Sequence, residues 1–373
     1  MSFEGFPHVV GWELTLACNL CCRHCASAAG LPRPDELTTE EALDLVDQFP
    51  ALLVREVHFT GGEPLLRPDW PRIAERAAEH GIATRIVTNG SPLVPKVIQQ
   101  IRDAGIETVG VSLDGLEATH DHQRQMRGLY RRVLAAIERL HAAGLKVGVL
   151  TAVNPRNLAE LPDLLALLVS MGVESWQLQP NLPQGRSEEN TDLHLSPRQY
   201  LELGAFFRGR RAEAQERGLH VVPADSLGYY TELDLAEPPW RGCPAGLFSV
   251  GITSDGRVKG CLTMPDDLTE GSLRDADLWE LWFREGAFPY TRDFALEQMG
   301  PQCRGCSWAE QCRGGCTSMS RVCGGGVHAD PYCFHGIRQR QPELFRTVMA
   351  AAGLAEAGAA GDGAAPVAYR GCF

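Results

Sequence analysis

Three cysteines near the N-terminus have a spacing that suits iron–sulfur chemistry. Cys18, Cys22 and Cys25 lie within eight residues, directly after an apolar run that predicts the first strand. Three thiolates on one short loop can bind three irons of a cubane cluster and leave the fourth iron open. An open iron can chelate a small molecule and pass it an electron, so the loop predicts redox radical chemistry. A zinc or structural thiol site is the alternative, although zinc more often has four ligands arranged in two pairs.

Most of the other cysteines gather in one C-terminal segment. Of the 13 cysteines in the 373-residue chain, four fall at positions 18–25, eight at 243–333 and one at 372. A cytosolic protein keeps its thiols reduced, so this clustering predicts metal ligands rather than disulfides. We interpret Cys21, which cannot replace Cys18 in the triplet, as a small packed thiol. We interpret Cys372 as an accident of composition, because nothing around it lowers its pKa or fixes its position.

The composition of the whole chain limits the classes of protein. With 44% hydrophobic residues, the chain predicts a sizeable globular core, and its length allows two or three domains. A net charge of -12 disfavours a nucleic-acid-binding surface, which needs clustered Lys and Arg. The sequence has no export signal and no apolar run long enough for a bilayer, so we expect a cytoplasmic protein without membrane contact.

Short β-rich runs alternate with helical segments from residue 9 to about residue 222. The predicted strands are 9–16, 56–60, 84–88, 108–113, 146–153 and 176–179. Amphipathic stretches such as 39–49, 129–143, 158–171 and 197–217 lie between or after them. About six units fit this length, which predicts an α/β fold, a partial (β/α)6 TIM-type barrel with ligands at the C-terminal ends of its strands. An open doubly wound sheet is the alternative.

Changes in composition predict the domain boundaries. Pro238-Pro239 interrupts the βα pattern, and the segment after it is rich in Cys and Gly. A segment with so little core needs another source of stability, and metal clusters bound by its cysteines can supply it. We predict a barrel domain at 1–232, a small cysteine-rich auxiliary-cluster domain at 233–349 and a flexible tail at 350–373.

A glycine-rich motif follows the second predicted strand. Gly61-Gly62-Glu63-Pro64 combines two glycines, which let the backbone approach a ligand closely, with a carboxylate that suits an amino group. Taken alone, the motif is equally typical of a plain turn. The cysteine triplet follows the neighbouring strand, however. Both features are therefore expected at one edge of a parallel sheet, within reach of one small molecule.

Together, the triplet and this motif resemble the radical S-adenosylmethionine superfamily. The resemblance implies that Cys18, Cys22 and Cys25 bind a 4Fe–4S cluster whose open iron takes the amino and carboxylate groups of S-adenosylmethionine. One electron would then cleave the sulfonium to methionine and a 5′-deoxyadenosyl radical, which abstracts a hydrogen atom from the substrate. The family usually has an aromatic residue just before the third cysteine, and His24 takes that place here.

The same resemblance implies further contacts to the cofactor. In similar enzymes, a serine on the fourth strand and an arginine twelve residues later contact the methionyl carboxylate. The matching residues here are Ser112 and Arg124, and a guanidinium does present paired donors that fit a carboxylate. A surface arginine and an unrelated strand-end serine are the alternative. Asn89 and Gln179 also end predicted strands and are further candidates for the pocket.

The C-terminal cysteines resemble the seven-cysteine pattern of the SPASM extension, over about 243–335. The resemblance implies two auxiliary iron–sulfur clusters of the 4Fe–4S type. It assigns Cys303, Cys306, Cys312 and Cys333 to auxiliary cluster II, and Cys243, Cys261 and Cys316 to auxiliary cluster I. Some relatives supply a fourth ligand to cluster I from a cysteine just before this pattern, but positions 223–242 contain none, and Cys323 is the nearest spare thiol. One or two zinc sites are the alternative.

Enzymes similar in both halves mostly modify ribosomally made peptides or proteins. Our first hypothesis is therefore a peptide maturase that forms a crosslink, an epimer or an oxidised residue. The second is a small-molecule enzyme, such as one that decarboxylates or dehydrogenates a tetrapyrrole of a haem pathway. Many peptide maturases have an N-terminal leader-binding domain, but only seventeen residues precede Cys18, which weakens the first hypothesis. A separate leader-binding protein could supply this function. We also expect an electron donor such as flavodoxin or ferredoxin. A non-enzymatic electron carrier has little need for Glu63, Ser112 or Arg124, and no general base is assigned.

Overall fold

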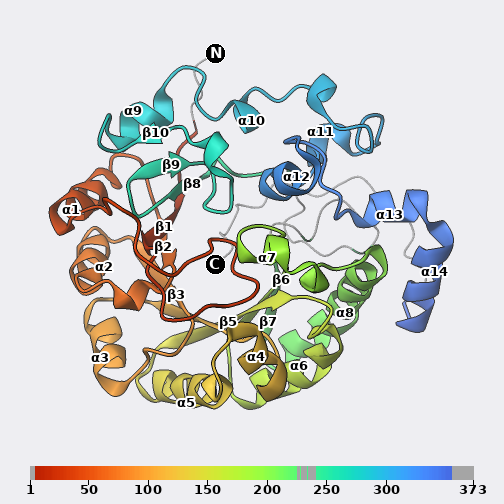
Figure 1. The fold of residues 1–373 in the computed structure, drawn as a ribbon, viewed down its shortest axis with the longest axis horizontal. Coiled ribbons are helices and arrows are strands. Elements are labelled where there is room, and N and C mark those ends of the chain that lie inside the picture. Colours follow the sequence, from red (N-terminus) through yellow and green to blue (C-terminus); the bar gives the residue numbers. More distant parts are fainter. Residues whose placement is uncertain (1–4, 225–226, 228–232, 234–240, 355–373) are drawn as a thin grey trace.

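The strands of the computed structural model form one ten-stranded sheet, curved into an open barrel (Figure 1). The structure describes residues 5–224, 227, 233 and 241–354. The order along the sheet is β10-β9-β8-β1-β2-β3-β4-β5-β6-β7. The strands are β1 (Val9–Thr15), β2 (Glu56–Gly61), β3 (Ala83–Thr88), β4 (Thr108–Ser112), β5 (Lys146–Val153), β6 (Ser175–Pro180), β7 (His220–Pro223), β8 (Ser249–Ile252), β9 (Arg257–Lys259) and β10 (Gly271–Ser272).

The first seven strands are parallel and lie side by side in the order of the sequence. A doubly wound sheet would reverse its strand order at a switch point, so the predicted partial (β/α)6 barrel is confirmed. The six predicted strands differ from the observed ones by at most one residue at an end. Strand β7 was not predicted.

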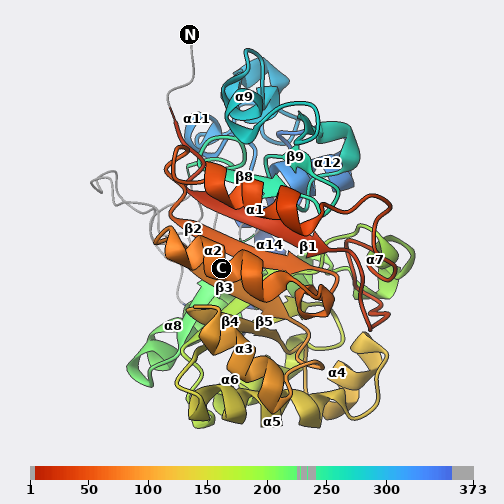
Figure 2. The same cartoon turned by 90° about the vertical axis from the view of Figure 1, so that its left-hand side faces the viewer.

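Helices cover the outside of the barrel (Figures 1 and 2). They are α1 (Thr39–Gln48), α2 (Trp70–Glu79), α3 (Pro95–Asp103), α4 (Glu117–Arg124), α5 (Leu129–Ala142), α6 (Leu161–Ser170) and α8 (Pro197–Glu216). The short helix α7 (Arg186–Glu189) lies nearer the centre of the ring, where Arg186 contacts the cysteine loop (Figure 1). Thr38 begins α1 with a capping box: its side chain accepts from the Glu41 N–H at 3.2 Å, and the Glu41 carboxylate accepts from the Thr38 N–H at 2.8 Å. No helix in the described ranges has the length and apolar character to cross a membrane.

Side chains alternate along each strand between the face of the sheet that contacts the helices and the face that lines the barrel interior. On β1, Trp12 packs against Phe59 with ring centroids 5.9 Å apart. On β6, Trp176 packs against Phe206 of α8 at 6.1 Å. Because successive residues of a strand point to opposite faces, Gln177 beside Trp176 faces the barrel interior. The buried Trp12, Phe59 and Trp176 thus lie between the sheet and its helices, on the face opposite Gln177.

The C-terminal segment continues the barrel sheet on the β1 side (Figure 2). Strand β8 pairs in parallel with β1, placing Ser249 opposite Val9, and β9 and β10 follow in antiparallel pairs. The remaining helices are α9 (Leu278–Phe283), α10 (Pro289–Arg292), α11 (Ala309–Cys312), α12 (Thr317–Gly324), α13 (Phe334–Arg340) and α14 (Pro342–Ala351). The predicted boundary at residue 233 stays a prediction. Most of the predicted tail, including Cys372, lies outside the described residues.

Aromatic packing joins the cysteine-rich segment to the barrel. Tyr200 on α8 stacks on Phe334 with ring centroids 4.2 Å apart and an interplanar angle of 11°. Its hydroxyl donates to the Tyr332 carbonyl at 2.9 Å. Residues 332–334 include the last cysteine of the C-terminal pattern, so the barrel wall directly supports that cysteine.

Candidate active site

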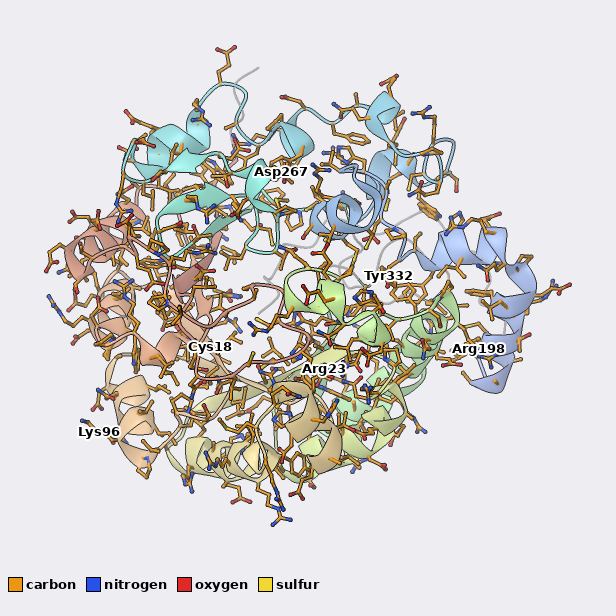
Figure 3. All side chains as sticks on the ribbon, in the orientation of Figure 1. Cys18, Arg23, Lys96, Arg198, Asp267 and Tyr332 are labelled. Carbon is orange, nitrogen blue, oxygen red and sulfur yellow. The ribbon has the colours of Figure 1, made fainter. Side chains whose placement is uncertain are left out.

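The cysteine loop follows β1 and lies near the centre of the ring of strands, where Cys18 and Arg23 are labelled in Figure 3. Backbone bonds join the two ends of the loop. The Cys18 N–H donates to the Gly30 carbonyl at 2.9 Å, and the Gly30 N–H donates to the Leu16 carbonyl at 3.1 Å. These bonds close residues 18–30 into one loop that carries all three predicted cluster ligands.

A segment that follows β6 clamps this loop. The main-chain N–H of Arg186 donates to the Cys25 carbonyl at 3.0 Å, and its Nε donates to the Cys22 carbonyl at 2.9 Å. Gly185 has a φ of 59°, and a Cβ at this position would lie 2.3 Å from the Ala26 carbonyl oxygen. The clamp therefore requires glycine. Neither clamp residue was predicted, because no spacing in the sequence connects Gly185 or Arg186 with the distant cysteines.

The three thiols suit a metal cluster chemically. Burial raises the pKa of Cys22 to about 11 and raises the pKa of Cys18 as well, so both are neutral thiols without a metal. Backbone N–H groups already point at two of the sulfurs: Leu20 donates to Cys18 Sγ and Ala29 to Cys25 Sγ, both at 3.4 Å. Cationic irons stabilise the thiolate forms, so this donor set fits a cluster with three cysteine ligands.

The glycines of the Gly61–Pro64 motif allow two chain segments to run in contact. The Gly62 N–H donates to the Thr15 carbonyl and the Glu63 N–H to the Ala17 carbonyl, each at 2.8 Å. Gly61 has a φ of 145°, and a Cβ on it would lie 2.2 Å from the Thr15 carbonyl oxygen. The motif thus pairs with the chain that leads into the cysteine loop, beyond the last regular pair of β1 and β2.

We expect the substitution Gly62→Ala to disturb the cysteine loop. A Cβ there would lie 2.3 Å from the Ala17 carbonyl oxygen and 2.4 Å from that of Leu16, so the two segments must separate. The expected cost is about 1–3 kcal/mol of folding free energy, with less iron bound after reconstitution. Thermal denaturation and iron analysis measure both effects. Gly30→Ala in the same loop is the control, because a Cβ there has no atom within 4 Å. Equal losses in both variants contradict this reading.

Glu63 supports the end of the neighbouring strand. Its fully buried carboxylate accepts from Thr88 Oγ1 and from the Asn89 N–H, both at 2.8 Å, and burial raises its pKa to about 7. Asn89 in turn donates to the Asn19 side chain at 3.0 Å and approaches Cys18 Sγ at 3.9 Å. A direct contact of Glu63 with a ligand amino group stays a prediction. In the structure, this carboxylate positions Asn89 against the cysteine loop.

Arg124 is held by the buried carboxylate of Asp114, which was not among the predicted site residues. Arg124 Nε donates to Asp114 Oδ2 at 2.7 Å, and the other Asp114 oxygen accepts from the Ala152 N–H at 3.0 Å. Burial opposes ionisation of Asp114, but the charge of Arg124 holds its pKa well below its usual range. Among the described residues, the terminal amino groups of Arg124 have no hydrogen-bond partner. They are thus available for the predicted cofactor carboxylate, a role that stays a prediction.

His24 is the third member of the buried group formed with Asp114 and Arg124. Its Nε2 lies 3.4 Å from Asp114 Oδ2, and burial lowers its pKa to about 4, so the imidazole is neutral near pH 7. A neutral flat ring in this place packs as the family's usual aromatic residue would. Ser112 ends β4 on the inner side of the barrel, and Gln179 lies on the inner side of β6. The structure thus brings the predicted cofactor contacts to the same edge of the sheet as the cysteine loop.

The interpretation of Cys21 as a packed thiol is wrong, because its side chain is exposed.

Four C-terminal cysteines line one pocket. Cys303, Cys306, Cys312 and Cys333 surround it together with residues such as Trp308 and Gly336. Burial, together with the neighbouring thiols, raises the pKa of Cys303 to about 11 and that of Cys333 to about 12. These are the four residues assigned to auxiliary cluster II, and four thiol donors around one pocket fit that group.

The remaining three cysteines of the pattern lie around the start of α12. Cys261 is close enough to Cys243 to add to the rise of the Cys243 pKa, which burial brings to about 11. Cys316 is the N-cap of α12, and the next residue, Thr317, lines a pocket with Cys243. Cys323 is exposed near the end of α12, where its Sγ contacts Met319 Sδ at 3.5 Å. It does not line this pocket.

Across the described part of the chain, no three His, Cys, Asp or Glu side chains converge on a point where one ion would sit. A cluster places each thiolate on a different iron, so such convergence is not a requirement for it.

Family models and one relative match most of this chain. The model of the radical SAM superfamily matches residues 12–168, and that of SPASM, an iron–sulfur cluster-binding domain, matches residues 243–307. The AdoMet-dependent heme synthase of Methanosarcina barkeri is 30% identical over 358 residues, covering 90% of this chain and 98% of the relative. The chain belongs to the radical SAM superfamily. It is a radical SAM enzyme with a SPASM domain, and its cofactors are S-adenosylmethionine and iron–sulfur clusters.

Another relative and two solved structures are also similar to this radical SAM enzyme. The mycofactocin maturase MftC of Mycobacterium tuberculosis is 29% identical over 347 residues, covering 91% of this chain and 85% of the relative. Among solved structures, Streptococcus suis SuiB bound to S-adenosylmethionine has a TM-score of 0.73 at 18% identity, over 88% of this chain and 77% of that one. Native anSMEcpe with bound AdoMet has a TM-score of 0.71 at 17% identity, over 92% and 99%. These two structures support the fold.

Each part of the site has a distinct task in this radical SAM enzyme. When bound, the cluster supplies the electron that cleaves S-adenosylmethionine. The clamp at Arg186 holds the ligand loop, and Glu63 sets the end of β3 against it. Asp114 orients Arg124, so that its remaining donors are fixed before a ligand arrives.

Proposed function

We propose that this enzyme modifies a peptide or a segment of a protein. Cleavage of S-adenosylmethionine would give methionine and a 5′-deoxyadenosyl radical that removes one hydrogen atom from the substrate. The product would be a crosslinked, epimerised or oxidised residue. The observation that carries the proposal is the buried, unpartnered amide oxygen of Gln177 on the inner face of the barrel.

This inner face suits amides better than carboxylates. Gln177 and Gln179 lie on the inner side of β6, and the buried Gln177 Oε1 has no hydrogen-bond partner among the described residues. Ser112 adds a hydroxyl on the inner side of β4. The inner-face arginine Arg85 is ion-paired with Glu56. A peptide can satisfy such amide and hydroxyl groups, whereas a tetrapyrrole with several carboxylates needs cations that are not already paired.

Two comparisons support a peptide substrate. MftC is named a maturase, and SuiB has also been solved with its precursor peptide SuiA, with a TM-score of 0.72 to this chain. The electron donor, such as flavodoxin or ferredoxin, the separate leader-binding protein and the cytoplasmic location remain predictions.

A tetrapyrrole substrate is the second candidate. The heme synthase of Methanosarcina barkeri aligns with this chain over 98% of its own length, so the same set of domains serves that activity. This candidate requires carboxylate-binding cations at the inner face, which the pairing of Arg85 with Glu56 opposes.

Substrate-dependent hydrogen transfer separates the two candidates. The reduced, reconstituted enzyme would be incubated anaerobically with S-adenosylmethionine and either a short deuterated peptide encoded beside its gene or Fe-coproporphyrin. We expect deuterium from the peptide in 5′-deoxyadenosine, together with a mass change of the peptide. Release of 5′-deoxyadenosine that responds to the porphyrin and not to the peptide overturns the proposal and favours the second candidate.

A substitution at Gln177 should weaken substrate binding without weakening the fold. Gln177→Leu removes an amide whose oxygen is buried and unpartnered, so the free energy of unfolding should stay the same or rise. The KM for the peptide should rise about 3- to 10-fold, because one neutral hydrogen bond contributes about 0.5–1.5 kcal/mol. Steady-state kinetics and denaturation measure both. Gln99→Leu, on the exposed face of α3, should change neither quantity. An unchanged KM for Gln177→Leu removes this residue from the substrate site.

A further inference from the structure

We propose that His328 is the fourth ligand of auxiliary cluster I, binding iron through Nε2 beside the thiolates of Cys243, Cys261 and Cys316. The sequence contains no cysteine at 223–242 to take this place. The inference rests on the iron–sulfur cofactors of the SPASM domain. It is independent of whether the substrate is a peptide.

The hydrogen bonding of His328 defines which ring nitrogen can bind a metal. Nδ1 lies 2.9 Å from the Arg313 carbonyl oxygen. A carbonyl oxygen only accepts, so Nδ1 carries the hydrogen and Nε2 presents a lone pair. Metal-binding histidines commonly donate their other N–H to a backbone carbonyl in this way, which fixes both the tautomer and the orientation of the ring.

The free nitrogen of His328 is buried without a partner. The residue is 3% exposed, and Nε2 has no hydrogen-bond partner among the described residues. Buried polar atoms in folded proteins are nearly always bonded, so this unpartnered acceptor is available to a ligand. Burial lowers the pKa of His328, which keeps the imidazole in the neutral form that a metal requires.

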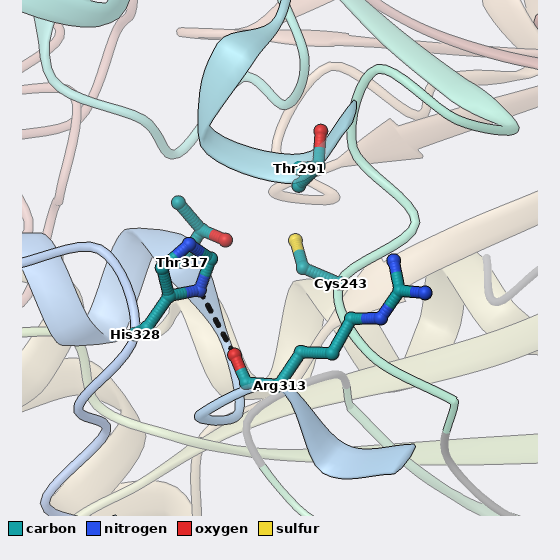
Figure 4. A pocket seen from close by; sticks show the side chains of 5 residues that line it. All are labelled: Cys243, Thr291, Arg313, Thr317 and His328. Atoms are coloured by element: carbon teal, nitrogen blue, oxygen red, sulfur yellow. Dashed lines mark hydrogen bonds between the residues drawn. The ribbon is translucent and has the colours of Figure 1, made fainter. Parts of the chain in front are cut away.

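His328 lines the same pocket as a predicted cluster ligand, Cys243. Figure 4 shows the imidazole of His328, with Nδ1 turned to Arg313 and the rest of the ring on the side of Thr317 and Cys243. Thr317 directly follows Cys316, so two of the three predicted thiolate ligands lie at or next to this pocket. The geometry thus places an imidazole and a thiol around one space.

The other residues that line the pocket are poorer ligands. Thr291 Oγ1 donates to the Ala245 carbonyl at 2.7 Å, and the guanidinium of Arg313 has no lone pair to offer. The position of His328 is also well supported. Phe294 packs edge-on against the His328 ring, with ring centroids 5.0 Å apart. The His328 carbonyl accepts a hydrogen bond from the Gly300 N–H at 3.1 Å. Such a ring is held for ligation before the cluster arrives.

A histidine ligand would change the properties of the cluster. A neutral imidazole in place of a thiolate makes the site less negative, which raises the reduction potential. It also closes the cluster, so substrate would not bind to an open iron there. Auxiliary cluster I would then accept and relay an electron.

Pulsed EPR on histidine-labelled protein tests the inference. The full chain would carry Cys18→Ala, Cys22→Ala and Cys25→Ala, so that the two auxiliary clusters remain, and would be reconstituted and reduced without S-adenosylmethionine. We expect a nitrogen hyperfine coupling that changes when the protein contains ¹⁵N-histidine. His328→Cys should retain the iron, lose this coupling and lower the reduction potential of one cluster. His80→Gln, on the far side of the barrel at the end of α2, should keep the coupling.

Two results would overturn the proposal: one rejects only the His328 ligand, and the other rejects the auxiliary clusters themselves. Roughly eight irons per chain without a histidine-dependent coupling would show that the clusters form and that His328 is not a ligand. Failure of the chain to bind any iron at the C-terminal cysteines would reject the auxiliary clusters themselves. Neither result depends on the peptide assay, so a failure of the proposed substrate is recognised separately.

Discussion

Cys22→Ser should abolish the reaction while leaving the auxiliary clusters in place. Cys22 is the most buried of the three loop cysteines, and its carbonyl is held by Arg186. Loss of one of three thiolates should remove the loop cluster, about four irons per chain, and with it all cleavage of S-adenosylmethionine. Iron analysis and chromatography of 5′-deoxyadenosine measure the two losses.

The adjacent cysteine offers a matched control. Cys21 is exposed, whereas Cys22 is buried. Cys21→Ser should therefore keep the iron content and the cleavage of S-adenosylmethionine. If Cys21→Ser abolishes cleavage and Cys22→Ser does not, the assignment of ligands in this loop is wrong.

Asp114→Asn should be among the most destabilising conservative substitutions in the barrel. The change removes the negative charge that pairs with buried Arg124 Nε at 2.7 Å, although the amide oxygen can still accept from the Ala152 N–H. Breaking a buried ion pair by removing one partner costs about 3–5 kcal/mol, because the other charge stays buried without compensation. Binding of S-adenosylmethionine should weaken as well, since Arg124 loses its orientation.

Urea denaturation of the reconstituted protein measures the loss of stability, and equilibrium dialysis measures cofactor binding. Asp47→Asn is the control: Asp47 is exposed and pairs with Arg76 and His80 on the outer surface. Exposed pairs contribute about 0–1 kcal/mol, so this variant should be almost unchanged. A loss below about 1 kcal/mol for Asp114→Asn contradicts the role given to the buried pair.

The barrel could be predicted because each of its longer strands is recognisable from the local sequence alone. Runs of β-branched and apolar residues ended by Gly61-Gly62 or Asn89-Gly90 predict each strand and its C-terminal turn, and parallel topology then brings the turns to one edge. Strand β7 was not predicted because it has only four residues. The pairing of β8 with β1 was not predicted because local sequence carries no information on distant strand pairing.

The metal ligands could be predicted because their spacing in the sequence is typical of iron–sulfur sites. The residues that hold them in place could not, because their contacts depend on packing in the folded chain. The grouping of Cys303 with Cys333 follows from a cysteine pattern, and both line one pocket. The partners that hold the site are different. Asp114 resembles an ordinary turn residue in the sequence, and the clamp at Arg186 lies 161 positions after Cys25, so only the fold brings either to its contact.

Release of 5′-deoxyadenosine tests the central assignment most directly. The anaerobic protein, reconstituted to roughly twelve irons per chain and chemically reduced, would be incubated with S-adenosylmethionine. We expect methionine and 5′-deoxyadenosine in equal amounts, and neither product from the variant Cys22→Ser. Full reconstitution of all three clusters with no 5′-deoxyadenosine, in the presence or absence of a peptide, would contradict the assignment of the Cys18, Cys22 and Cys25 loop to radical chemistry.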